Sequence, residues 1–119
     1  MLNSQKNFHK KLLGKKGEEL VAAYLKAKGC KVLKTNYRTP FGEADLIVQD
    51  GEEIAFVEVK TRQSNAFGAP KDAVDTFKQR RYYDIARYYW KQTGEEPNAR
   101  FDVAQVFFGG EIEYIKNAF

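Results

Sequence analysis

Apolar residues near the start of the chain recur with the spacing of a helix. Four of them share one side of it: Leu20, Val21, Tyr24 and Leu25. The pattern predicts a helix over about residues 15–28, and Gly29 follows as a typical C-cap residue. Residues 1–11 are rich in lysine and lack this pattern, so they are predicted to be loose. We therefore expect a basic tail of residues 1–14, followed by a single domain of residues 15–119.

The rest of the chain alternates between apolar runs and turn residues. Three strands are predicted in succession, over about residues 31–37, 43–49 and 53–61. Asp50-Gly51 is a strong signal for a two-residue hairpin between the second and the third. The polar stretch of residues 62–70 is predicted to be a loop. The remaining elements are a helix over about residues 74–92 and strands over about residues 101–108 and 112–115.

This order of elements, αβββαββ, predicts the fold class. The hairpin makes the second and third strands antiparallel neighbours, whereas the second helix can carry the chain back across the sheet. The fourth strand would then run parallel to the third. The sequence therefore predicts an α/β sandwich in which helices flank a mixed β-sheet.

The third predicted strand carries charged residues on an otherwise apolar face. Because side chains alternate along a strand, Ile54 and Phe56 share a face with Glu58 and Lys60. The opposite face, with Val57, is also apolar, as in a central strand. Charges beside a core are costly unless they are paired or bound to a metal. An ordinary salt bridge between Glu58 and Lys60 is the simpler alternative for a pair of this kind.

The second predicted strand favours the metal interpretation. Asp45 is expected to share a face with Ile47, and the hairpin places Asp45 beside Glu58 near one end of the sheet. Converging carboxylates suit Mg²⁺ or Mn²⁺. Such a metal would bind a scissile phosphate and activate a water. Lys60 could orient that water or neutralise charge on the phosphate, and Glu43, on the same side, could support the metal or only cover the mouth of the hairpin.

Basic residues of the second helix could contact phosphate. Its inner stripe is predicted to contain four apolar residues: Val74, Phe77, Ile85 and Tyr88. Lys78 and Arg81 fall on the same stripe, so they would either face the site or extend past the core edge into solvent. Arg62, directly after the third strand, could hold a phosphate or lie in a solvated loop.

Three further residues have structural alternatives. Asp102, on the fourth strand, is expected to be a partner for a buried cation rather than a metal ligand. Tyr83 and Trp90 are predicted on the outer face of the second helix, where they could stack on bases or form a dimer interface.

Composition narrows the possible chemistry. A net charge of +4 and a pI of about 9.1 fit a polyanionic partner such as nucleic acid. The single cysteine and single histidine exclude an internal disulfide and a cysteine-rich zinc site, so a metal would have to be bound by carboxylates. No apolar run is long enough to span a bilayer, and no apolar signal core follows the N-terminal lysines. We therefore expect a cytoplasmic protein without membrane contact.

These residues resemble a known family. Asp45 and, twelve residues further on, Glu58-Val59-Lys60 match the D-(12)-E-x-K pattern of the PD-(D/E)XK nuclease superfamily, with Ala44 where the superfamily's name has proline. More narrowly, the chain resembles the bacterial YraN-like family of endonuclease-like proteins. Six segments carry that resemblance: 17–18, 36–38, 42–46, 56–62, 67–70 and 100–103. Together they span nearly the whole chain, from about Lys15 to Val106.

The resemblance implies a restriction-endonuclease-like three-layer sandwich, similar to archaeal Holliday-junction resolvases. It implies metal-dependent cleavage of DNA, with branched or junction DNA as an expected substrate, and a homodimer by analogy, because two cuts need two active sites. A nucleic-acid-binding module of nuclease descent, with little or no activity, is the alternative. A structural adaptor that uses the exposed aromatic residues is a third interpretation.

Resolvase-like nucleases also use a glutamate on the first helix, which implies Glu18 or Glu19 here. Glu18 lies roughly 90° from the centre of the buried stripe, at its rim, whereas Glu19 lies roughly opposite, in solvent. Glu18 is therefore the expected third ligand, although it could simply stabilise the N-terminus of the helix.

Overall fold

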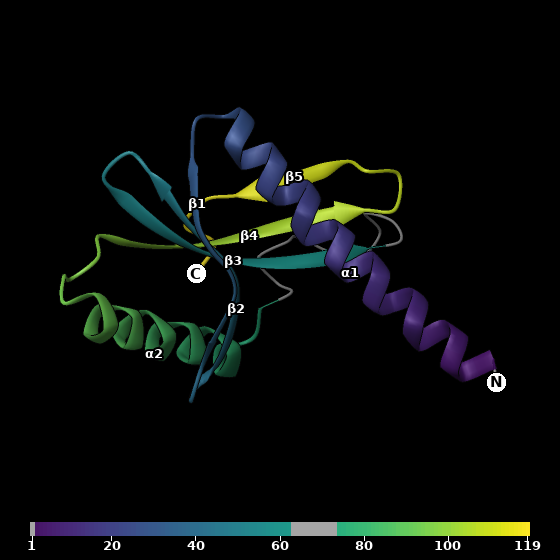
Figure 1. Cartoon of the computed structure of the whole chain (residues 1–119), viewed down its shortest axis with the longest axis horizontal. Helices are drawn as coiled ribbons and strands as arrows, with labels where there is room; N and C mark the ends of the chain where they lie inside the picture. Colours follow the sequence, from purple (N-terminus) through teal and green to yellow (C-terminus); the bar gives the residue numbers. More distant parts are fainter. Residues whose placement is uncertain (1, 63–73) are drawn as a thin grey trace.

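The structure is a computed structural model that describes residues 2–62 and 74–119, with side chains from Gly14 onward. It contains two helices and five strands (Figure 1). Their order is α1 (Leu2–Ala27), β1 (Lys31–Thr39), β2 (Gly42–Asp50), β3 (Glu53–Arg62), α2 (Thr76–Thr93), β4 (Ala99–Phe107) and β5 (Ile112–Ile115). The predicted element order is confirmed; most of the loop predicted at residues 62–70 lies outside the described residues.

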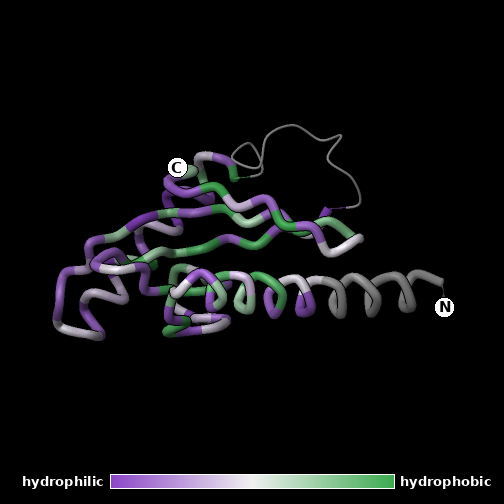
Figure 2. Tube along the Cα trace, turned by 90° about the horizontal axis from the view of Figure 1, so that it is seen from above, coloured by the Kyte–Doolittle hydropathy of each residue, from purple (hydrophilic) through white to green (hydrophobic). Residues whose placement is uncertain are grey.

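The five strands form one mixed sheet in the order β1-β2-β3-β4-β5. Neighbouring strands are antiparallel except β3 and β4, which are parallel as predicted. The α2 segment makes the crossover that such a pair requires. Figure 2 shows α1 running along one side of the strands, which are rich in apolar positions.

Two apolar clusters lie on the two faces of the sheet. One packs α1 against it through Val21 and Leu25, with Leu46 and Val57 among its strand residues. The other packs α2 against it through Tyr82, Ile85 and Ala86, with Ile47 and Phe56 among its strand residues. Helices on both faces of a mixed sheet make this an α/β sandwich, compatible with the restriction-endonuclease-like fold that the resemblance implied. Neither described helix is long and apolar enough to cross a membrane.

The expected loose tail is wrong, because α1 begins at Leu2 rather than near residue 15. Residues 2–13 contain no proline or glycine, and leucine, lysine and glutamine are good helix formers. An amphipathic pattern marks the part of a helix that packs against a core, but a helix can continue beyond that part. The division of the chain into a tail and a domain stays a prediction.

The hairpin between β2 and β3 is present, one residue later than its sequence signal. Asp50 pairs with Glu53, so the two-residue turn is Gly51-Glu52. Gly51 has a φ of +62°, a left-handed conformation that glycine adopts without strain.

Helix α2 is capped at both ends. The Asp75 side chain accepts a hydrogen bond from the backbone N–H of Lys78 at 2.8 Å. At the other end Gly94, with a φ of 77°, donates its N–H to the carbonyl of Trp90. These caps fix where the helix begins and where it ends.

The predicted inner stripe of α2 is only partly correct. Ile85 is buried, but the other buried residues are Tyr82 and Ala86, whereas Phe77 is 73% exposed. The first turn of α2 lies beside the charged end of β3, where Lys78 pairs with Glu58. Phe77 therefore does not pack against an apolar surface of the sheet.

Candidate functional site

The strands β2 and β3 separate at the end of their hairpin. Their pairing stops at Leu46 opposite Val57, one step before Asp45 would face Glu58. The Asp45 carboxylate fills this position, since its Oδ2 accepts a hydrogen bond from the backbone N–H of Val59 at 2.7 Å. We call this point of separation, between Asp45 on β2 and Glu58 on β3, the β2–β3 fork. It places a carboxylate from β2 beside the charged end of β3, as the sequence predicted.

The sequence pattern predicts that Asp45 shares a face of the sheet with Ile47, but the strand does not alternate regularly at this point. Ala44 and Ile47 belong to the cluster on the α2 face, although residues three apart on a regular strand face opposite sides. The alternation is therefore broken at Asp45. Its carboxylate meets Val59 and, from α1, Glu18.

Glu58 is the most buried of the candidate carboxylates, with 5% of its surface exposed. The Tyr82 hydroxyl donates a hydrogen bond to its Oε2, and Lys60 Nζ lies 3.4 Å from its Oε1. Lys78 Nζ, from α2, pairs with the same Oε1. The carboxylate is thus held by one neutral donor and two ammonium groups.

Glu18 reaches this cluster from α1, whereas Glu19 is exposed. Glu18 lies beside Asp45 and Asn36. With the Asn36 amide oriented to match donors with acceptors, its nitrogen donates to Glu18 at 3.0 Å and to Glu43 at 2.9 Å. The choice of Glu18 over Glu19, made from helix geometry, therefore agrees with the contacts.

The electrostatics of the cluster reflect crowded negative charge. Burial, followed by the charge of Glu58, raises the pKa of Asp45 to about 8, and the hydrogen bond from Val59 only partly opposes this. Burial also raises the pKa of Glu18, although its hydrogen bonds to Asp45 and Asn36 oppose the rise. Near neutral pH, burial and the neighbouring carboxylates therefore favour the protonated form of Asp45.

The two lysines shift in opposite directions. Burial, helped by the neighbouring Lys78, lowers the pKa of Lys60 against the attraction of Glu58. Burial also acts to lower the pKa of Lys78, but its hydrogen bond and charge interaction with Glu58 outweigh burial and raise it. Lys78 is therefore the stronger ion-pair partner of Glu58.

The donor set suits a hard divalent cation, but it is not a preformed cage. Glu18, Asp45 and Glu58 offer only oxygen ligands, and their repulsion, which a proton on Asp45 relieves, would also be relieved by a cation. Among the side chains that the structure describes, in residues 14–62 and 74–119, no three potential ligands are grouped closely enough to hold a metal ion. Mg²⁺ is usually bound by only one or two carboxylates together with waters and substrate phosphates, so two ligands from this cluster would suffice.

The remaining candidate residues differ in whether they contact the carboxylate cluster. Lys78 joins the cluster through Glu58. Arg81 instead packs beside Gly42, at the β1–β2 turn. Arg62 Nε lies 3.4 Å from Gln105 Oε1, and Glu43 pairs with the exposed Arg38 at 3.8 Å in addition to its contact with Asn36.

Two residues of the cluster were not expected from the sequence. Tyr82 is fully buried and orients Glu58, but on a helical projection it is simply a core tyrosine. Asn36 has a φ of 49°, and asparagine is one of the few residues that adopts this left-handed conformation readily. Its signals in the sequence were that preference and its place in segment 36–38 of the family resemblance.

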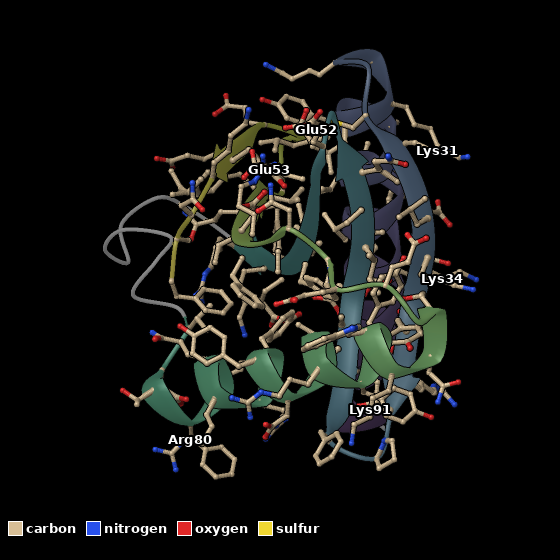
Figure 3. All side chains as sticks on the ribbon, turned by 90° about the vertical axis from the view of Figure 1, so that its left-hand side faces the viewer. Lys31, Lys34, Glu52, Glu53, Arg80 and Lys91 are labelled. Carbon is tan, nitrogen blue, oxygen red and sulfur yellow. The ribbon has the colours of Figure 1, made fainter. Side chains whose placement is uncertain are left out.

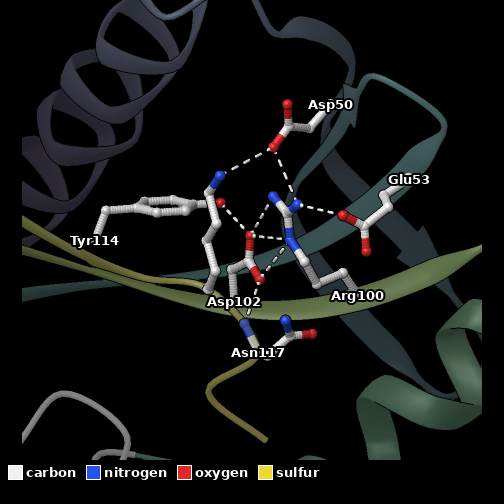
Figure 4. A network of polar contacts seen from close by, with 7 residues as sticks. Asp50, Glu53, Arg100, Asp102, Tyr114 and Asn117 are labelled. Atoms are coloured by element: carbon white, nitrogen blue, oxygen red, sulfur yellow. Dashed lines mark hydrogen bonds and ion pairs between the residues drawn. The ribbon is translucent and has the colours of Figure 1, made fainter.

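Asp102 lies in a separate polar network (Figure 4) and partners a buried cation, as predicted. It is completely buried and accepts hydrogen bonds from Arg100, the Tyr114 hydroxyl at 2.6 Å and the Asn117 N–H at 3.0 Å. Arg100, only 3% exposed, also pairs with Asp50 and Glu53. This network joins the β2–β3 hairpin to β4 and the C-terminal segment.

Replacing Asp45 with asparagine is expected to stabilise the metal-free protein by about 1–3 kcal/mol at neutral pH. Asparagine can still accept the Val59 N–H but carries no charge. The pKa of Asp45 is raised from 3.8 to about 8 in the folded protein. The loss of folding stability caused by ionised Asp45 is therefore absent at low pH and grows as pH rises between these two values. Urea unfolding should therefore show a large increase in the free energy of unfolding of Asp45→Asn at neutral pH and no increase near pH 4.

Glu19→Gln is the control for this prediction, because it removes an exposed charge from the same region. It is expected to leave the free energy of unfolding almost unchanged. An equal gain for Asp45→Asn at both pH values would show that packing, rather than charge, causes the effect.

Comparison with known proteins identifies the family. The sequence profile described as "Uncharacterised protein family UPF0102" matches residues 17–106. A UPF0102 protein of Alkaliphilus metalliredigens is 47% identical over 92% of this chain and 98% of its own length. Those of Thermodesulfovibrio yellowstonii and Geobacter metallireducens are 46% and 44% identical, over 90% and 95% of this chain and 95% and 96% of their own lengths. The YraN-like resemblance is thus confirmed at the level of the family: this chain belongs to UPF0102.

Proposed function

We propose that this protein is a metal-dependent endonuclease that hydrolyses phosphodiester bonds in DNA. The observation that carries the proposal is the β2–β3 fork, where Asp45 and Glu58 converge beside Lys60. The pKa of Asp45 is raised by burial and by the charge of Glu58, and perturbed pKa values of this kind cluster at functional sites. The resemblance to the PD-(D/E)XK superfamily supports the same conclusion, since it rests on these three residues.

Asp45 and Glu58, with Glu18 as a third candidate, would hold Mg²⁺ or Mn²⁺. The bound metal would polarise the scissile phosphate and generate the attacking hydroxide. The protein's own groups set up this chemistry. Tyr82 holds the Glu58 carboxylate in position through its hydroxyl. Lys60 carries its ammonium 3.4 Å from Glu58, where it can stabilise charge that develops on the phosphate.

Lys78 provides a second positive charge at the mouth of the cluster. It pairs with Glu58 and has 29% of its side chain exposed, so it can reach solvent and a phosphate. A net charge of +4 favours a polyanionic substrate. The choice of DNA, the preference for branched or junction DNA and a homodimer that makes two cuts rest on the resemblance alone.

A cleavage assay on linear duplex, flapped and four-way DNA tests the proposal. We expect strand cleavage with Mg²⁺ or Mn²⁺ and none with a chelator. Glu111→Gln, which removes an exposed carboxylate, is expected to cleave as the parent does. Failure to cut any of these substrates, together with no calorimetric binding at millimolar Mn²⁺, would overturn the assignment.

A nucleic-acid-binding module without catalysis is the second candidate. The Lys78–Glu58 ion pair favours it, because it neutralises a carboxylate that a metal would need. This alternative requires DNA binding that is unchanged by a chelator and no strand cleavage with either metal. The same assay, run with a binding measurement, separates the two candidates.

A further inference from the structure

Two exposed phenylalanines stand near the carboxylate cluster. Phe77, in the first turn of α2, is 73% exposed, and Phe41, at the β1–β2 turn, is 51% exposed. Single exposed apolar residues are common on protein surfaces. These two, however, line one depression of about 280 Å³, together with Arg80, Arg81 and Asp84. We call these five residues the Phe77 surface.

The Phe77 surface is held in shape by its neighbours. The Arg81 guanidinium lies over the Phe77 ring, 5.3 Å from its centroid. The stem of Arg81 packs so closely on Gly42 that a Cβ there would lie 2.4 Å from Arg81 Cδ. Gly42 also has a φ of +135°, which favours glycine. Phe41 makes an edge contact with Tyr88, at 6.4 Å between ring centroids.

The surface adjoins the proposed catalytic groups through α2. Phe77 directly precedes Lys78, which pairs with Glu58, and Arg81 follows one helical turn later. Figure 3 shows the Arg80 side chain pointing away from the sheet near the start of α2. The surface therefore combines exposed rings with a cationic edge, beside the carboxylates.

Charge decides which ligand fits this surface. Arg80 and Arg81 line it with one carboxylate, Asp84, which itself lies 3.4 Å from Arg87. Lys78 adds a further cation at its border. Aromatic rings flanked by arginine and lysine are how proteins bind single-stranded nucleic acid, since every base presents a face for stacking and every phosphate a negative charge.

We propose that the Phe77 surface stacks an unpaired base of a nucleic-acid strand, with Arg80 and Arg81 holding the adjacent phosphates. Phe77 is the main platform because it is the most exposed large apolar residue of the described chain. The bases of a continuous duplex are already stacked on one another, so the surface selects substrates with unpaired nucleotides. This inference rests on the proposed nuclease function and extends it to the substrate's structure.

Fluorescence anisotropy with a labelled oligothymidylate tests this inference in the presence of a chelator, so that no cleavage occurs. Phe77→Ala is expected to weaken binding of the oligothymidylate by about 5- to 100-fold. Binding of a blunt duplex of the same length should change less than about 2-fold, because its phosphate contacts remain. Phe77→Trp should restore binding, because it returns an aromatic face.

Phe108→Ala is the matched control, since Phe108 is also an exposed phenylalanine, 53% exposed, but lies outside the Phe77 surface. It should bind the oligothymidylate as the parent does. Equal losses for Phe108→Ala and Phe77→Ala, unchanged binding by Phe77→Ala, or no binding by the parent would each overturn the inference. Conversion of a parent dimer to a monomer by Phe77→Ala would also overturn it, because the surface would then be an interface between copies.

The inference and the proposed function fail in different ways. A parent that binds oligothymidylate through Phe77 but cuts no DNA supports the stacking surface and contradicts the nuclease. A parent that cuts flapped DNA while Phe77→Ala binds oligothymidylate normally supports the nuclease and contradicts the stacking surface.

Discussion

Glu58→Gln is expected to lower the rate of DNA cleavage by roughly a thousandfold. Glutamine has the size of glutamate and can still accept the Tyr82 hydroxyl hydrogen bond. It loses the negative charge that a divalent metal requires and that Lys60 and Lys78 now neutralise. Single-turnover cleavage with saturating Mg²⁺ measures the effect on the chemical step.

A control variant and a metal titration separate catalysis from folding. Glu52→Gln changes an exposed glutamate in the β2–β3 turn and should leave the rate unchanged. Calorimetry with Mn²⁺ should show binding by the parent and by Glu52→Gln, but much weaker binding by Glu58→Gln. If Glu58→Gln stays folded, binds Mn²⁺ normally and cleaves at the parent rate, Glu58 has no role in the chemistry.

Asp102→Ala is expected to cost about 3–5 kcal/mol of folding stability, which is a large part of what a domain of this size has. The substitution leaves Arg100, 3% exposed, without the carboxylate that its Nε and one terminal nitrogen both contact. Tyr114 and the Asn117 N–H lose their acceptor as well. Urea unfolding at neutral pH measures the loss.

Two further variants test the cause of that loss. Asp84→Ala removes an exposed ion pair with Arg87 and should cost less than about 1 kcal/mol. A double variant, Arg100→Met with Asp102→Leu, removes both buried charges and should recover much of the stability, because no charge is left unpaired. If Asp102→Ala costs no more than Asp84→Ala, the network is not a main source of stability.

The sequence by itself determined the order of elements and indicated the main candidate site residues. Alternation along a strand and helical spacing depend only on local geometry, so they located the two helices and five strands that the structure describes. Charged residues in an apolar strand pattern are rare for a physical reason, the cost of desolvation, and this identified Glu58 and Lys60. Helix geometry alone separated Glu18 from Glu19. Asp102, on the fourth strand, was expected to be a partner for a buried cation, and it pairs with Arg100.

Periodicity within one segment does not show where a neighbouring helix, strand or apolar face ends. Only the tertiary structure decided this. Phe77 lies on the predicted inner stripe, yet it is exposed because the apolar face of the sheet stops before it. Tyr82 became a partner of Glu58 only when α2 crossed β3. Asp45 meets Val59 because β2 and β3 separate at that position. The hairpin signal predicted that Asp45 and Glu58 lie together, but the separation of β2 and β3 that turns the Asp45 carboxylate toward Val59 depends on both strands, and no single segment of the sequence contains it.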